Sequence, residues 1–453
     1  MQTASFAIVG ALAMLAAAAS NSAFTADVDH YVIDNASYTY CHPGYPSAQS
    51  YAPLPNATLE LVQAVVRHGD RTPVNYIPNN DNEWRCNEVE QETYLHGAGE
   101  SKQNTTGSFK QIIEIPKWNQ KYGFENKIWS GSCEEGELTD RGKHQHSTLG
   151  AHLRSIYVDK LGYLPSELSS TDEIYLRTTH IWRTKNSAES LLGALWPKRG
   201  ITPASSIPLH TLPSQIETMY GNTGACPRIS ALMDDIVKTD GYQKFMKDQG
   251  PLMARLMDIL GVSESHWKDG WDGYFDVLNA RQCHQFNLPC KMNGTQSTDS
   301  CVTAADLEQV NRNANYETAY KFRDSPLSQK LTRLYIGSFV GTLRDQMKDH
   351  IDGHSQKLKF ALYSGHDSTI WPLLGVLGAS DQQSLWPPYA SNVLYELWKQ
   401  QDGSRVVRVI YNGQVLQTRD SEKWCDLNAC PLDQFFKRME QFIPSDITSE
   451  CAV

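Results

Sequence analysis

Short apolar runs, bounded by turn residues, recur near both ends of the chain and predict a β-sheet. Each run is rich in β-branched or aromatic residues, a composition that favours strands. The predicted strands cover residues 59–66, 173–178, 358–365, 392–398 and 405–413. The first run, LELVQAVV, ends abruptly in Arg67, His68, Asp70 and Arg71, four ionisable side chains whose burial is unfavourable without a binding partner.

Between these runs, apolar residues spaced by three and four positions predict helices. In the stretch 183–197, the spacing i, i+3, i+4 and i+7 is occupied by Ala188, Leu191, Leu192 and Leu195. Pro197 ends this run, as expected for a helix terminus. A second helix is predicted over 139–161, with Thr139 as its N-cap.

The order of these elements predicts the domain organisation. Strand and helix alternate at both ends of the chain, whereas residues 203–324 are richer in helical and Cys-bearing loop segments. We therefore predict an α/β domain made of residues 24–202 and 325–453, interrupted by a mainly helical insert at 203–324. No internal repeat and no low-complexity tract is present.

Composition and charge restrict the partners. The 453 residues are 40% hydrophobic, which is sufficient for a full core. The formal net charge of −10 disfavours nucleic acid and anionic membrane surfaces as general partners, because phosphate polymers are repelled. A small anionic substrate remains compatible with this net charge if the side chains around its binding site are positively charged.

The N-terminal segment resembles a secretion signal. The apolar stretch 6–20 is rich in small residues and precedes a polar segment, with a cleavage region near 19–23. It is shorter than a typical membrane span. We predict a signal peptide at 1–23, although no Lys or Arg precedes the apolar stretch, so a retained membrane anchor is the alternative.

Cysteines and sequons fit the same oxidising compartment. The even number of ten cysteines, scattered along the chain, favours disulfides whose pairing the sequence leaves open. A zinc site at Cys283, His284, Cys290 and Cys301 is disfavoured because paired C-x-x-C elements are missing. Candidate glycosylation sequons begin at Asn35, Asn56, Asn104 and Asn293. The expected location is outside the cell, or in the secretory pathway or a lysosome-like compartment.

Polar side chains follow several of the predicted strands. Ligands of open α/β sheets bind outside the carboxyl ends of the strands, where Arg67-His68 and His366-Asp367 are both placed. Arg177 closes the strand at 173–178, and Arg183 opens the next helix. Four arginines and two histidines at one edge predict an electropositive pocket, and guanidinium groups match the oxygens of phosphate.

Simpler interpretations exist for each feature alone. An Arg-His pair at a strand end is commonly a surface loop with salt bridges, and Asp70 can be a local ion-pair partner of Arg71. His366-Asp367 can cap the helix that begins near Ser368. The joint occurrence favours a binding site. His144, His146 and His180 are interpreted as solvated or packed side chains.

The motif RHGDRTP at 67–73, with the distant GHD at 365–367, resembles the histidine acid phosphatases, a branch of the phosphoglycerate-mutase-like superfamily. The resemblance extends to GELTDRGKHQH at 136–146 and to the arginine-containing segment at 175–197. Details such as CHQFNLPC, ALYSGHDSTI and LYELW look closer to the lysosomal-type and xylose-phosphate phosphatase branches than to fungal phytases. The resemblance implies a three-layer α/β domain with the helical insert as a cap.

The resemblance also implies roles for individual residues. His68 would be the nucleophile that takes the phosphoryl group, and Asp367 would protonate the leaving group. The phosphate oxygens would be held by Arg67, Arg71, Arg183 and His366. The segment 179–182 departs from the family pattern, since THIW replaces acidic residues that are common there, and a different polarity at the entrance is expected.

General chemistry agrees with these roles. Neighbouring arginines disfavour the protonated form of an imidazole, which keeps a nucleophilic nitrogen available in acid. A preformed ring of arginines stabilises a transferring phosphoryl group, so neither a metal nor another cofactor is expected. The predicted substrate is a small phosphomonoester.

Three other functions fit parts of the pattern. A phosphomutase would share the nucleophilic histidine, but it usually acts in the cytosol, which the secretion signal disfavours. A phytase needs additional Lys or Arg around a wide pocket, whereas acidic residues interleave Lys238, Lys244, Lys247 and Lys268. An inactive binding homologue remains the non-enzymatic alternative, because fold does not determine function.

Overall fold

The computed structural model describes most of the chain beyond its N-terminal segment. The described residues are 39–78, 82–84, 86, 90–97, 104–111, 130–131, 133–168, 170–197, 207–294 and 296–453. The predicted signal peptide and the sequon at Asn35 lie outside this set. None of the helices within it combines the length and apolar composition that a membrane span requires.

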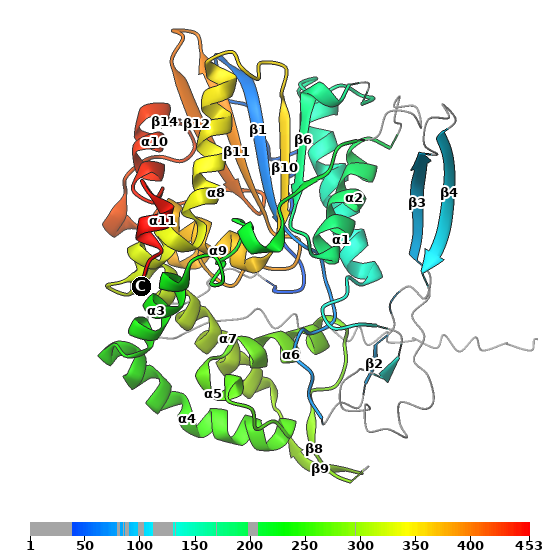
Figure 1. Ribbon diagram of the computed structural model, residues 1–453, viewed down its shortest axis with the longest axis vertical. Coiled ribbons are helices and arrows are strands. Elements are labelled where there is room, and N and C mark those ends of the chain that lie inside the picture. Colours follow the sequence, from blue (N-terminus) through cyan, green and yellow to red (C-terminus); the bar gives the residue numbers. More distant parts are fainter. Residues whose placement is uncertain are drawn as a thin grey trace, which may run out of the picture.

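A mixed β-sheet forms the centre of the α/β part (Figure 1). Its path is β13-β12-β11-β1-β10-β6-β7, and β14 pairs with β12. These strands are Gln414–Val415, Arg405–Tyr411, Asn392–Gln400, Ala57–Arg67, Phe360–Gly365, Ile174–Thr178, His210–Thr211 and, for β14, Cys430–Pro431. β1 runs parallel to β10 and antiparallel to β11, and β10 runs parallel to β6. All five predicted strands are confirmed.

Helices cover both faces of this sheet, as the three-layer prediction requires. One face is covered by α1 and α2, and the other by α8, α9 and α10 (Figure 1). The helices of these layers are Asp140–Arg154, Trp182–Leu195, Ser328–Ile351, Asp367–Leu377 and Leu432–Glu440. Along β1, Val62, Ala64 and Val66 pack against α1 and α2, whereas Leu61 and Val65 pack on the opposite face. This alternation places buried apolar side chains on both faces, as expected for a central strand.

The two helices predicted from periodicity are present, and close packing positions the first. The hydroxyl of Thr139 accepts a hydrogen bond from the backbone N–H of Gly142, so the predicted N-cap is confirmed. Helix α1 continues into a π-helical turn, Ser155–Lys160. A Cβ atom on Gly69 would collide with the backbone of Gly142. Glycine is therefore required where the loop after β1 crosses the first turn of α1.

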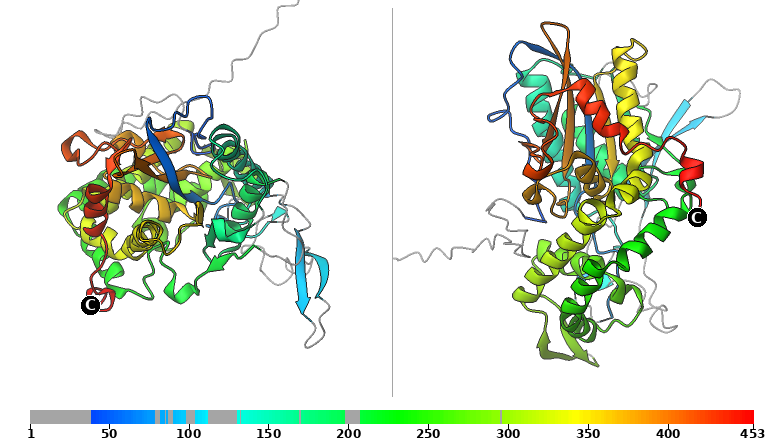
Figure 2. Two further views of the ribbon diagram at one scale, coloured as in Figure 1. Left: turned by 90° about the horizontal axis from the view of Figure 1, so that it is seen from above. Right: turned by 90° about the vertical axis from the view of Figure 1, so that its left-hand side faces the viewer.

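The range predicted for the insert contains mainly helices, which lie beyond the end of the central sheet (Figure 2). They are α3 Pro227–Val237, α4 Asp240–Leu260, α5 His266–Asp269, α6 Asp272–Cys283 and α7 Ala304–Ala319. A hairpin formed by β8 Cys290–Asn293 and β9 Gln296–Cys301 was not predicted. The apolar cluster of α4, α5, α6 and α7 includes Tyr40, Ile77 and Tyr389, which belong to the flanking parts of the chain. The two parts therefore share buried contacts.

Several smaller elements carry little apolar signal in the sequence and were not predicted. Two-stranded pairings join β2 Glu83–Trp84 to β5 Ser130–Gly131 and β3 Glu90–Gly97 to β4 Asn104–Gln111. A short helix, α11 Ile447–Glu450, lies near the C-terminal end of the chain.

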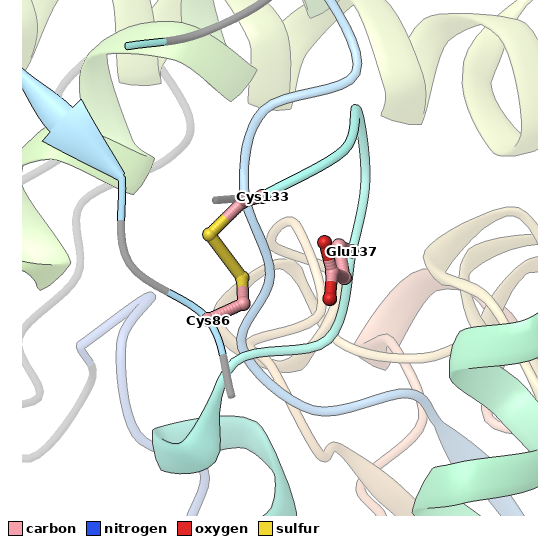
Figure 3. Close-up of side chains that lie close together, drawn as sticks. All are labelled: Cys86, Cys133 and Glu137. Carbon is pink, nitrogen blue, oxygen red and sulfur yellow. A yellow bond between two sulfur atoms is a disulfide. The ribbon is translucent and has the colours of Figure 1, made fainter. Parts of the chain in front are cut away.

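All ten cysteines form disulfides, so the zinc alternative is wrong. The pairs are Cys41–Cys283, Cys86–Cys133, Cys226–Cys451, Cys290–Cys301 and Cys425–Cys430. Figure 3 shows Glu137 beside the Cys86–Cys133 bond. Because disulfide sulfur atoms offer no thiolate ligand, this group is not a metal site.

Candidate active site

Six residues predicted from the sequence meet at the carboxyl ends of β1 and β10. Arg67 ends β1, and the backbone N–H of His68 donates to the carbonyl oxygen of Gly365, the last residue of β10, at 2.9 Å. His366 and Asp367 begin α9 directly after that strand. Arg183 lies in the first turn of α2. The sixth residue, Arg71, lies close enough to lower the pKa values of His68 and Arg183.

His68 is held in one tautomer. Its side chain is buried, and Nδ1 lies 2.8 Å from the carbonyl oxygen of Gly69. A carbonyl oxygen only accepts hydrogen bonds, so Nδ1 carries the proton and Nε2 keeps its lone pair. Burial, followed by the charges of Arg183 and Arg67, holds the pKa of His68 well below its usual value. The imidazole is therefore neutral, with a free ring nitrogen, in mildly acidic solution.

Arg67 is fixed on several sides. Its Nη2 atom lies 2.8 Å from Asp367 Oδ2 and donates to the hydroxyl of Tyr40 at 2.8 Å. Its Nη1 atom donates to the carbonyl oxygen of Pro387. The guanidinium carbon lies 4.5 Å from the ring centroid of Tyr389 and 5.0 Å from that of Tyr40. These contacts hold a fully buried cation in one orientation.

Arg71 is held by a carboxylate from the predicted insert. Asp276 of α6 accepts from Arg71 Nη1 at 2.7 Å, and its second oxygen accepts from the backbone N–H of Val74 at 2.7 Å. Both Arg71 and Asp276 are buried. Asp276 therefore orients the guanidinium group and connects the helical range to the loop after β1.

Arg183 differs from its neighbours because no carboxylate pairs with it among the described residues. Within the described part of the chain, its guanidinium group forms one hydrogen bond, a long one of 3.5 Å to the carbonyl oxygen of Gly136. Burial, together with the charge of Arg71, lowers the pKa of Arg183 to about 10. A buried cation without a paired carboxylate is stabilised strongly when an anion binds next to it.

The three arginines of this cluster also carry unused hydrogen-bond donors. The Nε atoms of Arg67, Arg71 and Arg183 are all buried without a hydrogen-bond partner. Buried unpaired donors are rare in native proteins, and an oxyanion would satisfy them. The N-terminal end of α9 adds a favourable dipole for a negative ligand.

His366 and Asp367 complete the cluster. The His366 Nε2 atom lies 3.0 Å from the Thr179 hydroxyl, and the ring centroid is 5.5 Å from that of His68. Burial alone would raise the pKa of Asp367, but Arg67 and Arg71 outweigh it and hold this pKa below its usual value. The carboxyl group is therefore ionised in the free protein.

The structure corrects one expectation and one alternative interpretation at this site. Arg177 does not join the cluster, because its Nη2 atom pairs with Glu217 Oε1 at 2.7 Å. Strand alternation directs Arg177 to the face of the sheet that α8 covers, where it lies over Phe339. Asp70 does not pair with Arg71. Its Oδ1 atom accepts from the hydroxyl of Thr139 and from His284 Nε2, both at 2.6 Å.

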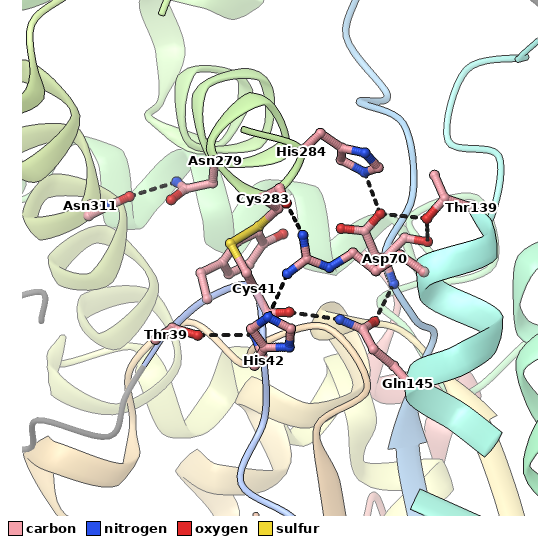
Figure 4. Close-up of a disulfide and its surroundings, with 12 residues drawn as sticks. Thr39, Cys41, His42, Asp70, Thr139, Gln145, Asn279, Cys283, His284 and Asn311 are labelled. Carbon is pink, nitrogen blue, oxygen red and sulfur yellow. Dashed lines mark hydrogen bonds and ion pairs between the residues drawn. A yellow bond between two sulfur atoms is a disulfide. The ribbon is translucent and has the colours of Figure 1, made fainter. Parts of the chain in front are cut away.

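Figure 4 shows the Asp70 network beside the Cys41–Cys283 disulfide. Gln145 of α1 accepts from the backbone N–H of Asp70 and donates to the carbonyl oxygen of Cys41. Arg141 donates to the carbonyl oxygen of Cys283. The network thus joins the loop after β1, α1, α6 and the segment before β1.

Of the three histidines interpreted as solvated or packed, His146 is packed inside the protein. His146 is buried and donates from Nε2 to the carbonyl oxygen of Arg67 at 2.9 Å, while burial lowers its pKa to about 4. Sequence reasoning missed Asp276, Tyr40, Tyr389, Thr179 and His284, because each lies far along the chain from the residue it supports. His284 itself belongs to the CHQFNLPC segment that carried a family resemblance, but nothing local indicated that it would be a partner of Asp70.

Replacing Asp276 with Asn should weaken anion binding without unfolding the protein. Asn keeps the shape but loses the charge that fixes Arg71, and a hydrogen bond to a charged group contributes about 1.5–3 kcal/mol. We expect the inhibition constant of inorganic phosphate to rise roughly 10- to 100-fold. Asp248→Asn, at an exposed position of α4, is the matched control. An unchanged inhibition constant in Asp276→Asn would remove this residue from the site.

A model of the histidine phosphatase superfamily (branch 2) matches residues 58–412. Counting factor 60 of Dictyostelium discoideum is 30% identical over 420 residues, which cover 90% of this chain and 93% of that protein. Prostatic acid phosphatase of Bos taurus is 25% identical, covering 87% and 88%, and lysosomal acid phosphatase of Xenopus laevis is 27% identical, covering 87% and 78%.

Solved structures agree with the fold. The phytase of Hafnia alvei in complex with tartrate is similar with a TM-score of 0.57 at 14% identity, covering 89% of this chain and all of that one (100%). This likeness concerns the fold alone. The match to the family model includes all of β1 after its first residue, all of α9 and the six clustered residues. The chain therefore belongs to branch 2 of the histidine phosphatase superfamily, as the RHGDRTP and GHD motifs predicted.

Proposed function

We propose that the protein is an acid phosphatase that hydrolyses phosphomonoesters through a phosphohistidine at His68. The observation that carries the proposal is the unprotonated Nε2 of His68 beside three arginines with unused, buried Nε donors. The names of the prostatic and lysosomal relatives support the same activity.

The first half of the reaction forms a covalent intermediate. Nε2 of His68 attacks phosphorus, and the bond between phosphorus and the ester oxygen breaks. Arg67, Arg71, Arg183 and His366 hold the phosphoryl oxygens, whose charge spreads in the transition state. Asp367 gives a proton to the departing oxygen, since an alkoxide is a poor leaving group.

The second half regenerates the free histidine. Water attacks the phosphohistidine, and Asp367, now ionised, accepts its proton. The phosphorus–nitrogen bond breaks, and inorganic phosphate leaves. The chain's own cations provide the stabilisation of charge in both halves.

The activity should have an acidic optimum. Arg67 and Arg71 keep Asp367 ionised in the free protein, so the proton must arrive with the substrate or after the bound phosphate raises the pKa of Asp367. A phosphomonoester loses its second proton near pH 6. Because the pKa of His68 is depressed, acidification to this range leaves Nε2 free.

Phosphate release from p-nitrophenyl phosphate, followed against pH, tests this proposal. We expect kcat/KM to fall as the pH rises above about 6. Release that increases through neutrality into the alkaline range would contradict the assignment, and absence of release at every pH would favour the inactive binding homologue.

We also propose that the protein enters the secretory pathway and that residues 203–324 act as a cap on the α/β domain. Five disulfides and exposed sequons at Asn56 and Asn293 support the first proposal. The contact between Asp276 of α6 and Arg71 supports the second.

A further inference from the structure

A cavity of about 310 Å³ lies between the helices of the 203–324 range and α9. The walls combine aromatic rings with carboxylates, and the side chains that matter here are Asp269, Asp272, Phe322, Tyr335, Trp371 and Trp386.

Trp386, which lines the cavity, also contacts the proposed proton donor. The indole N–H of Trp386 donates to Asp367 Oδ2 at 3.2 Å. Trp371 lies one turn after Asp367 in α9, and its ring centroid is 4.5 Å from that of Trp386. Through Trp386, these two rings therefore connect the cavity wall to Asp367.

The charge of the cavity is negative. Neither Asp269 nor Asp272 forms an ion pair among the residues that the structure describes, and desolvation and the nearby Glu317 raise the pKa of Asp272. Lys321 also lines the cavity and its charge acts on Asp272, but its Nζ atom pairs directly with Glu317 Oε1 at 2.6 Å, so this one cation is shared among three carboxylates.

Both carboxylate oxygens of Glu317 already accept hydrogen bonds from the protein. Its Oε1 atom also accepts from the hydroxyl of Tyr242 at 2.6 Å, and its Oε2 atom accepts from the backbone N–H of Trp271 at 2.7 Å. The carboxylates left for a ligand are therefore those of Asp269 and Asp272.

We propose that this cavity binds the leaving group of the substrate and favours a small alkylammonium group linked to phosphate by a short chain. The inference rests on the proposed phosphatase activity. Aromatic faces attract a quaternary or primary ammonium through cation–π interactions, and two unpaired carboxylates add electrostatic attraction. A polyanionic leaving group, such as a polyphosphorylated inositol, would be repelled by the same carboxylates.

The test compares two esters of the same shape and different charge. Phosphocholine carries a quaternary nitrogen where 3,3-dimethylbutyl phosphate carries a quaternary carbon. We expect the ratio of their kcat/KM values to fall roughly 3- to 30-fold in the double variant Asp269→Asn, Asp272→Asn. Comparing ratios between proteins cancels the different intrinsic reactivity of the two esters. Asp248→Asn, which removes a charge at an exposed position on α4, should leave the ratio unchanged.

A ratio that is equal in the wild-type protein and the double variant would overturn the inference. Wild-type protein provides an independent measurement, because choline should inhibit p-nitrophenyl phosphate hydrolysis more strongly than 3,3-dimethylbutanol, and equal inhibition would also overturn it. Failure to hydrolyse p-nitrophenyl phosphate would instead overturn the proposed function. The two failures are thus distinguishable.

Discussion

His68→Ala should lower phosphate release by roughly 10⁵- to 10⁶-fold, the loss typical of removing a covalent nucleophile. Alanine removes the only atom that is proposed to bond to phosphorus, while the arginines that bind the phosphate remain. The variant should therefore still bind inorganic phosphate. Acid quenching during turnover of a radiolabelled ester should trap an acid-labile phosphoprotein in the wild type and not in the variant.

A second histidine provides the control for this experiment. His144 lies on the exposed side of α1, and His144→Ala should retain the activity and the labelled intermediate. Wild-type rates in His68→Ala, or equal labelling of both variants, would show that another group attacks phosphorus.

Asp367→Asn should slow phosphoenzyme formation in a manner that depends on the leaving group. Asparagine keeps the shape of the side chain but has no carboxyl proton to give. For an ester with an alkoxide leaving group, the rate should fall roughly 10²- to 10⁴-fold, the usual contribution of a general acid. For p-nitrophenyl phosphate the loss should be much smaller, because the phenolate departs with little protonation.

The measurement must be the rate of phosphoenzyme formation in a single turnover. Asp367 is also proposed to assist the hydrolysis of the intermediate, so a steady-state rate would combine two effects. Loss of the Arg67–Asp367 ion pair should affect both esters equally. An equal slowing of the two esters would therefore leave Asp367 as a residue that orients Arg67 and would assign the proton to another donor.

The sequence predicted the catalytic edge because strand ends and motif residues are local features. Arg67 and His68 follow a run that is apolar on both faces, and His366 and Asp367 follow another. Parallel pairing of these two strands brings their carboxyl ends together. The sequence alone could indicate this meeting of the strand ends, because ligands of open α/β sheets bind there.

The supporting residues could not be predicted in the same way. Asp276 holds Arg71 across 205 residues, and His284 holds Asp70 across 214. No periodicity or motif connects such pairs, and an aspartate on a helix is commonly solvated. Arg177 was misplaced for a different reason, since the face to which a strand residue points depends on the register of the strand. Its ion-pair partner, Glu217, lies 40 residues further along the chain.

The position of β1 in the sheet has a consequence for biosynthesis. β1 pairs with β10 and β11, which begin at Phe360 and Asn392, so the ribosome completes this apolar strand long before either partner exists. At roughly 5–20 residues per second, the interval is about 15–60 s. During this time both edges of the strand segment in the nascent chain are unpaired and can pair with other chains. Newly made protein should therefore depend on chaperone binding to the segment 57–67 until translation passes residue 400.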